Sequence, residues 1–206
     1  MGLAISEHGR GINVYLESMS RLGALLVIAI ASAGAGAQSI DVRDVDGARH
    51  ALLAPKPGRL EVVFFISSDC PISNHYIPEI KRICDEYTPR GVGCVTVYPD
   101  GAETAASVRT HRREYGVGPA IPAIIDTNQA MVTAIGPKVT PEAAVYASTG
   151  RVYRGRIDDL YVDVSRARRQ PTSRDLRSAL DATLSGKQPA QAETQAVGCF
   201  IPQRAS

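Results

Sequence analysis

The chain has 206 residues, of which 44% are hydrophobic and 21% charged, as is ordinary for a soluble globular protein. The formal net charge is only +2, so overall charge argues neither for nucleic acid nor for an acidic partner. Aromatic residues are sparse and tryptophan is absent, which argues against a stacking surface for bases. The length suits one domain with appended segments.

The first 37 residues differ from the rest of the chain. Behind Met19 and a basic residue, an apolar run reaches to about Gly34, and Ala35-Gly36-Ala37 follows. This order predicts a secretory signal peptide cleaved after Ala37, because the run is too short to span a bilayer comfortably. Residues 1–18 are polar and aperiodic, so we expect the true start at Met19. The alternative is an uncleaved N-terminal segment, the one expected contact with a membrane. Either way the domain is expected to be exported, periplasmic or otherwise extracytoplasmic, where disulfides persist.

Residues 38–187 alternate between strand and helix patterns. The first half predicts a hairpin-like entry turning at Asp46-Gly47, a buried strand over 60–66, a helix over 71–87, a strand over 93–98 and a helix ending near Gly116. The second half predicts an extended piece, a short helix from about Gln129 and two strands joined at Thr149-Gly150. A last helix, capped by Thr172 or Ser173, ends the series. This order predicts an α/β fold with a mixed sheet and helices on both faces. The helical connections make the first core strands parallel, and the turn makes the last two antiparallel.

Two charged segments are expected to lie in solvent. In the helix ending near Gly116, Val108 is expected to face inward, while Arg109, Arg112 and Arg113 form a solvated basic face. His111 lies among these arginines and is expected at the surface. The stretch "SRARRQ", residues 165–170, is expected to be a solvated loop.

The four cysteines lie in unequal settings. Cys84 is on the apolar side of the helix over 71–87 and Cys94 is in the strand over 93–98, so both are expected to be small core residues. Cys70 stands where a strand ends and a helix begins, followed by a proline at a position that tolerates a missing N–H. The unpaired amides and the positive end of the helix lower the pKa of a cysteine placed there, which predicts a reactive thiolate.

Cys199 lies in "TQAVGCFIP", in a tail over 188–206 that begins with a polar linker. A free exposed thiol is a hazard in an exported protein. One interpretation is that Val197, Phe200 and Ile201 dock on the domain and bring Cys199 to Cys70; the chain-entropy model gives such a long-loop bridge about 4–5 kcal/mol of stabilisation. The other interpretation is a disordered tail with an incidental cysteine.

Three motifs carry a resemblance to a known family: "DCPISNHYIPEI" at 69–80, "TPEAAVYASTGRVYRGRIDD" at 140–159 and the terminal "GCFI" at 198–201. Together they resemble the thioredoxin-fold redoxins of the AhpC/TSA type. More narrowly, they resemble an exported bacterial subgroup with a single-cysteine CPIS motif and a C-terminal GC motif. The resemblance covers roughly residues 40–187 and implies a thioredoxin-like mixed sheet.

The resemblance also implies roles for individual residues. Cys70 matches the attacking cysteine of the thioredoxin motif, and Ser73 occupies the resolving position, so the usual internal dithiol is missing. Pro141 matches the cis-proline that faces the active-site cysteine, which leaves the Thr140 backbone free to pair with a bound peptide or thiol. The alternative for Pro141 is an ordinary trans proline opening an edge strand.

Three functions are compatible with these residues. The first is thiol–disulfide exchange with protein thiols or disulfides, in which Cys70 attacks and Cys199 resolves in place of Ser73. An unidentified reductant would complete this cycle. The second is peroxide reduction, as in an antioxidant thiol peroxidase; here Ser67 matches the hydroxyl position, but Val63 stands where peroxiredoxins have a proline. The third is a non-catalytic copper- or partner-binding module in which the two cysteines and a histidine hold a soft ion.

The metal interpretation has weak sequence support. Copper chaperones of the Sco type use two cysteines three residues apart, and Ile66 occupies the first of these positions here. His75 follows Cys70 by five residues and is displaced from its helix face. No HxxH or CxxC spacing occurs. We therefore predict no bound metal or cofactor and no nucleic-acid partner.

Overall fold

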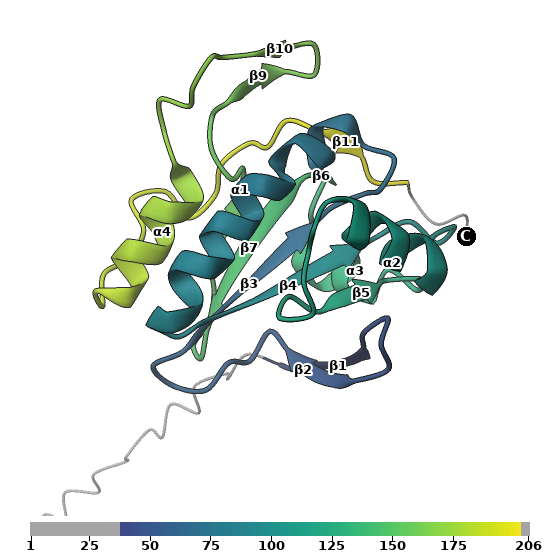
Figure 1. The fold of residues 1–206 in the computed structure, drawn as a ribbon. Helices are drawn as coiled ribbons and strands as arrows, with labels where there is room; N and C mark the ends of the chain where they lie inside the picture. Colours follow the sequence, from purple (N-terminus) through teal and green to yellow (C-terminus); the bar gives the residue numbers. More distant parts are fainter. Residues whose placement is uncertain (1–37, 203–206) are drawn as a thin grey trace, which may run out of the picture. The chain divides into compact units, whose positions relative to one another are not determined.

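The computed structural model describes residues 38–202, so the predicted signal peptide lies outside the described residues. A five-stranded sheet with the order β5-β4-β3-β7-β8 forms the centre of this part of the chain (Figure 1). Its strands are β3 (Leu60–Phe65), β4 (Val92–Tyr98), β5 (Ala123–Ile125), β7 (Glu142–Ala147) and β8 (Gly150–Gly155). β3, β4 and β5 are parallel, whereas β7 is antiparallel to β3 and β8 to β7. The predicted mixed sheet is confirmed.

Helices cover both faces of the sheet because successive side chains of a strand point to opposite faces. Val62 and Phe64 of β3 belong to one core with residues of α1 (Pro71–Tyr87), α2 (Ala105–Glu114) and α4 (Asp175–Leu184). Val63 and Phe65 belong to a second core with α3 (Ala130–Ile135) and the hairpin of β1 (Ile40–Arg43) and β2 (Arg49–Leu52). A short 3-10 helix, η1 (Thr88–Arg90), follows α1. None of the helices in residues 38–202 is long and apolar enough to cross a membrane.

Two further strand pairs lie outside the central sheet. β9 (Tyr161–Asp163) and β10 (Arg166–Ala167) form an antiparallel hairpin; residues 165–170 are exposed, as predicted, but the expected loop is interrupted by β10. β11 (Cys199–Phe200) pairs antiparallel with β6 (Val139–Thr140). This second pair joins the C-terminal tail to the segment just before Pro141.

The start of α4 also differs from the prediction. Arg174 is its N-cap and makes no capping hydrogen bond, so neither Thr172 nor Ser173 caps the helix. Both instead donate backbone N–H groups to Oδ1 of Asp159, at 2.6 and 2.8 Å. The hydroxyl of Thr172 also bonds to Asp159. The carboxylate of Asp159, which follows β8, thus binds the two residues that were expected to cap α4.

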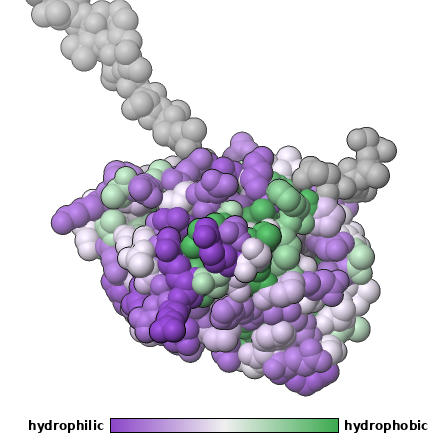
Figure 2. Space-filling model, turned by 90° about the horizontal axis from the view of Figure 1, so that it is seen from above, coloured by the Kyte–Doolittle hydropathy of each residue, from purple (hydrophilic) through white to green (hydrophobic). Residues whose placement is uncertain are grey.

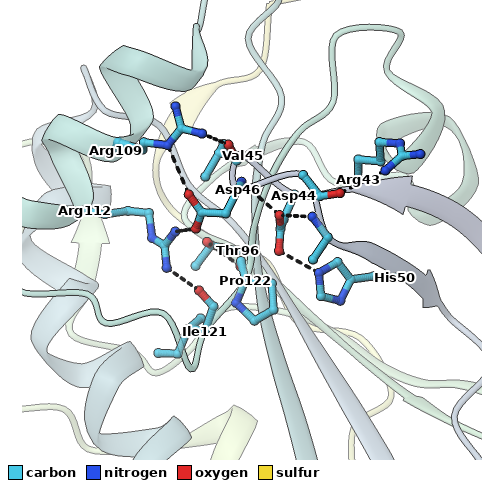
Figure 3. A network of polar contacts seen from close by, with 12 residues as sticks. Arg43, Asp44, Val45, Asp46, His50, Thr96, Arg109, Arg112, Ile121 and Pro122 are labelled. Atoms are coloured by element: carbon cyan, nitrogen blue, oxygen red, sulfur yellow. Dashed lines mark hydrogen bonds and ion pairs between the residues drawn. The ribbon is translucent and has the colours of Figure 1, made fainter.

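The basic face of α2 is only partly solvated. His111 and Arg112 are buried, so both expectations of exposure are wrong, whereas Val108 faces the core as predicted. Figure 3 shows the cause for Arg112: Asp46, in the turn of the entry hairpin, pairs with Arg109 at 3.1 Å and Arg112 at 3.5 Å. Arg112 Nη2 also donates to the carbonyl oxygens of Gly118 and Ile121, each at 2.8 Å. These acceptors stabilise the buried guanidinium through Nη1 and Nη2, whereas its Nε is buried without a hydrogen-bond partner.

We expect Arg112→Met to lower the free energy of unfolding by about 2–4 kcal/mol, because it removes charged hydrogen bonds to the buried Ile121 carbonyl and the partly buried Gly118 carbonyl while keeping the aliphatic stem. Urea unfolding followed by circular dichroism measures the change. Arg113→Met on the exposed side of the same helix is the control and should change stability by less than about 0.5 kcal/mol. Equal effects of the two substitutions would contradict the linking role of Arg112.

Candidate active site

Cys70 lies at the junction that the sequence predicts, between β3 and α1. It is the N-cap residue of α1, and its Sγ accepts a hydrogen bond from the backbone N–H of Ser73 at 3.4 Å. Pro71 occupies the first helical position, where its missing N–H costs nothing. The sulfur therefore faces the amide end of a 17-residue helix, which stabilises negative charge.

Cys199 is joined to Cys70 by a disulfide that spans 129 positions in the sequence. The two Cα atoms lie 6.0 Å apart, within the ordinary range for a disulfide. The tail therefore docks on the domain and brings Cys199 to Cys70, as the first of the two interpretations of Cys199 predicts. Cys70 is only 2% exposed in this closed form and belongs to the core that β3 forms with α1, α2 and α4.

The tail is anchored on the N-terminal side of Cys199 by backbone and side-chain contacts. Arg154 N–H donates to Ala192 O at 2.9 Å, and Thr194 N–H donates to Arg154 O at 3.0 Å, so the tail runs alongside β8. The Thr194 hydroxyl lies 2.6 Å from the Tyr153 hydroxyl and accepts from the N–H of Arg156 at 3.1 Å. These bonds hold the tail independently of the disulfide.

A second anchor follows Cys199. Ile201 is buried and its N–H donates to Lys138 O at 3.3 Å, while Gln129 Nε2 donates to Pro202 O at 2.6 Å. Phe200 is 87% exposed, so the prediction that it docks is wrong, and Val197 is half-buried. Contacts on both sides of Cys199 thus restrain where its sulfur can go.

The segment before Pro141 forms the opposite wall of the site. The Thr140–Pro141 bond is cis, as the resemblance implies, so the trans alternative is wrong. Thr140 pairs with Cys199 in the β6–β11 ladder, and its carbonyl oxygen lies 3.2 Å from Sγ of Cys70. Gly198 crosses so close to this wall that a Cβ atom there would lie 2.6 Å from the Thr140 carbonyl carbon. Only glycine fits at this crossing.

Ser67 and Ser73 shape the loop that carries Cys70. Ser73 is buried, and its Oγ accepts from the Ser67 N–H at 3.4 Å. Ser67 O in turn accepts from the Cys70 N–H at 3.3 Å. Both serines therefore take part in the geometry of the loop. Their roles as resolving-position and peroxide-positioning residues stay predictions.

A buried polar chain supports the same loop. Asn74 Nδ2 donates to Ser68 O at 2.8 Å, which leaves its Oδ1 to accept from His111 Nε2 at 2.8 Å. His111 Nδ1 then accepts from the Tyr98 hydroxyl at 2.9 Å. Burial lowers the pKa of His111, so the neutral ring required by this chain is favoured. The network fixes the loop on the N-terminal side of Cys70.

A buried carboxyl group lies close to the wall formed by Pro141. Asp158 Oδ1 accepts from the Tyr76 hydroxyl at 2.5 Å and from the Leu160 N–H at 2.9 Å. Tyr76, Asp158, Pro141 and Val197 line the same small hollow. Burial raises the pKa of Asp158 more than the Tyr76 hydrogen bond lowers it.

This shift predicts a pH dependence of stability. Because the folded protein raises the pKa of Asp158, it binds this proton more tightly than the unfolded chain, so stability falls as pH rises from the unfolded pKa through the folded one. Asp158→Asn keeps an oxygen acceptor for Tyr76 and removes the charge. We expect the variant to be more stable than the wild type at pH 7 by roughly 1 kcal/mol and equally stable near pH 3. Urea unfolding at both pH values measures this.

The neighbouring carboxyl provides a control of opposite sign. Burial alone would raise the pKa of Asp159, but hydrogen bonds from Thr172 and Ser173 hold it down, to about 2. Asp159→Asn should therefore destabilise the protein at pH 7. A loss of stability at pH 7 in Asp158→Asn as well would contradict the assignment of a costly buried charge at that position.

The other two cysteines stay free and lie away from the disulfide. Cys84 is buried and Cys94 half-buried, so core packing is confirmed fully for the first and partly for the second. The neighbouring Cys94 thiol, and then burial, raise the pKa of Cys84. This keeps Cys84 protonated and unreactive.

A groove of about 660 Å³ opens beside the tail. One wall consists of residues 162–164 of the β9–β10 hairpin, and the other is residues 193–198 and Phe200 of the tail. Val164 and Phe200 are exposed along it. The view from above this end of the protein shows apolar residues among hydrophilic ones (Figure 2). Phe200, directly after Cys199, therefore faces open space, whereas Gly198, directly before it, is buried.

Solved structures show which fold this is. No family model and no curated protein matches the chain. An uncharacterized conserved protein from Geobacillus kaustophilus is 26% identical, with a TM-score of 0.72 over 84% of this chain and 93% of that one. A hypothetical protein from Sinorhizobium meliloti is 28% identical, with a TM-score of 0.71 over 84% and 95%. A Neisseria meningitidis protein provisionally assigned as a thioredoxin is 19% identical, with a TM-score of 0.56 over 75% and 93%.

The fold is thioredoxin-like, with a mixed α/β sheet. Within this class the site is defined by one disulfide between a helix N-cap and a C-terminal tail. Sequence reasoning missed Thr194 and Gly198 as parts of its surroundings. A glycine directly before the tail cysteine was the one available signal, because glycine often marks a close backbone approach.

Proposed function

We propose that this protein is a thiol–disulfide oxidoreductase whose redox centre is the Cys70–Cys199 pair. One observation carries the proposal: the tail brings Cys199 from 129 positions away onto a sulfur at the N-terminus of α1. Ser73 N–H and the helix end favour the thiolate of Cys70, whereas the Thr140 carbonyl favours the thiol. A Cys70 thiolate that can re-form its disulfide with a nearby, restrained Cys199 suits thiol–disulfide exchange.

The reaction follows from these positions. In the dithiol form, the Cys70 thiolate attacks one sulfur of a substrate disulfide, forms a mixed disulfide and releases one substrate thiolate. The Cys199 thiolate then attacks Sγ of Cys70, closes the Cys70–Cys199 bond and releases the second substrate thiolate. Two electrons pass from the protein to the substrate, and the released thiolates take up protons from solvent. A thiol reductant returns the protein to the dithiol form.

The proposed setting is outside the cytoplasm. The apolar run behind Met19 favours export, and a disulfide between distant residues persists in an oxidising compartment. The partners would then be protein thiols or disulfides together with a separate reductant. Fractionation of cells that express the full chain, with mass determination of the processed N-terminus, tests this.

Insulin reduction by dithiothreitol tests the proposed activity, with wild type, Cys70→Ser, Cys199→Ser and Cys94→Ser compared. We expect Cys70→Ser to lose catalysis and Cys94→Ser to retain it. Cys199→Ser should accumulate a mixed disulfide on Cys70, because the resolving thiol is absent. Catalysis by Cys70→Ser equal to that of the wild type would refute the proposal.

The same four proteins test the two alternatives. A wild type that turns over hydrogen peroxide but leaves insulin unreduced would identify a thiol peroxidase. A reduced wild type that binds Cu(I) stoichiometrically, with neither activity, would identify a binding module. Each of the two alternatives should depend on Cys70 and Cys199 in the same way as disulfide exchange does. The three functions are therefore separated by the assay in which the wild type is active, and not by the effects of the substitutions.

A further inference from the structure

We infer that the closed form is reduced by attack on Cys199 rather than on Cys70, so that the reductant forms its mixed disulfide with the C-terminal tail. The inference rests on the proposed function and assigns the sulfur that faces the reductant. The substrate and the reductant would then use different cysteines of the same pair.

The first argument is access. Cys70 is 2% exposed and lies beneath the tail, between the start of α1 and the Thr140 carbonyl. Cys199 is partly exposed, and the next residue, Phe200, is 87% exposed. The 660 Å³ groove beside the tail is lined by Gly198 and Phe200 and not by Cys199 itself, whose sulfur is bonded to Cys70. A thiol that approaches the closed form therefore meets the Cys199 segment first.

The second argument is the leaving group. In thiol–disulfide exchange, the sulfur that departs most readily is the one that best carries negative charge. Cys70 would depart toward the Ser73 N–H and the amide end of α1. Cys199 lies in a two-residue strand, which lacks such a dipole. Attack on Cys199 makes Cys70 the leaving thiolate, so access and charge stabilisation favour the same direction.

The electrons balance in two steps. A reductant thiolate bonds to Sγ of Cys199, the Cys70–Cys199 bond breaks, and its electron pair stays on Cys70. A second reductant thiolate then attacks the reductant sulfur of the mixed disulfide. It forms a reductant disulfide and releases the Cys199 thiolate. The chemical class of reductant is any thiol small or extended enough to reach the groove.

Trapping of the first intermediate tests the inference, with glutathione as the probe. The oxidised full chain is mixed with glutathione, quenched at a series of times from milliseconds onward with N-ethylmaleimide, digested and analysed by mass spectrometry. Extrapolation to zero time removes any later migration of glutathione between the cysteines. The peptides of Cys84 and Cys94 serve as internal controls, because neither cysteine belongs to the bridge.

We expect glutathione on Cys199 and N-ethylmaleimide on Cys70 at the earliest times, in an excess of about tenfold or more over the reverse pattern. The reverse pattern, or equal amounts of both, would overturn the inference and leave the proposed function intact. A starting protein without the Cys70–Cys199 peptide would overturn both. The linked peptide in the unquenched sample therefore separates the two failures.

Discussion

Cys199→Ser should lower the free energy of unfolding of the oxidised protein by about 5 kcal/mol, the largest effect that we expect from a single substitution. The disulfide closes a loop of 129 positions, and in the chain-entropy model a loop of this length restricts the unfolded chain by about that amount. Guanidinium chloride unfolding of the oxidised wild type and the variant, followed by circular dichroism, measures the difference.

Two controls separate the bridge from the loss of a sulfur atom. Reduced wild type should unfold like Cys199→Ser, because both lack the bridge. Cys94→Ser changes a half-buried free thiol and should cost less than about 1 kcal/mol. Coincident unfolding curves for the oxidised wild type and Cys199→Ser would show that the bridge is not formed or does not constrain the unfolded chain.

Gly198→Ala should weaken closure of the disulfide on the order of 100-fold, because a methyl group there overlaps the Thr140 backbone and overpacking of this kind costs up to about 3 kcal/mol. The obstacle is main chain, which cannot rotate away as a side chain would. β11 must therefore leave β6 and carry Cys199 away from Cys70. The equilibrium constant for closure in glutathione redox buffers, read by mass spectrometry after an acid quench, measures the loss.

Gly118→Ala is the matched control for this substitution. Nothing lies within 4 Å of a Cβ at Gly118, so closure should be unchanged there. Normal closure in Gly198→Ala would mean that the tail reaches Cys70 by another path.

The junction that carries Cys70 could be predicted from sequence because its signals are local. An apolar strand, a cysteine and a proline at the first helical position follow one another within residues 60–71, and the structure has β3, the N-cap and the start of α1 there. The cap of α4 could not be predicted in the same way. Asp159, which takes the donors of Thr172 and Ser173, lies 13 and 14 positions away.

The two wrong predictions near the site have geometric reasons. Adjacent residues of a strand point to opposite sides, so once Cys199 faces Cys70, Phe200 must face solvent. His111 lies among arginines in the sequence, yet its partners Tyr98 and Asn74 are 13 and 37 positions away. Such distant pairings leave no local trace in the pattern of charge or hydropathy.

The tail that carries Cys199 also covers part of the edge of the central sheet. β8 is the last strand of the central sheet, and the N–H and carbonyl of Arg154 on its outer side are taken by Ala192 and Thr194. A bare strand at the margin of a sheet invites pairing with another chain and the growth of insoluble assemblies. Loss of the last fifteen residues would therefore remove Cys199 and also leave the outer edge of β8 free to pair with another chain.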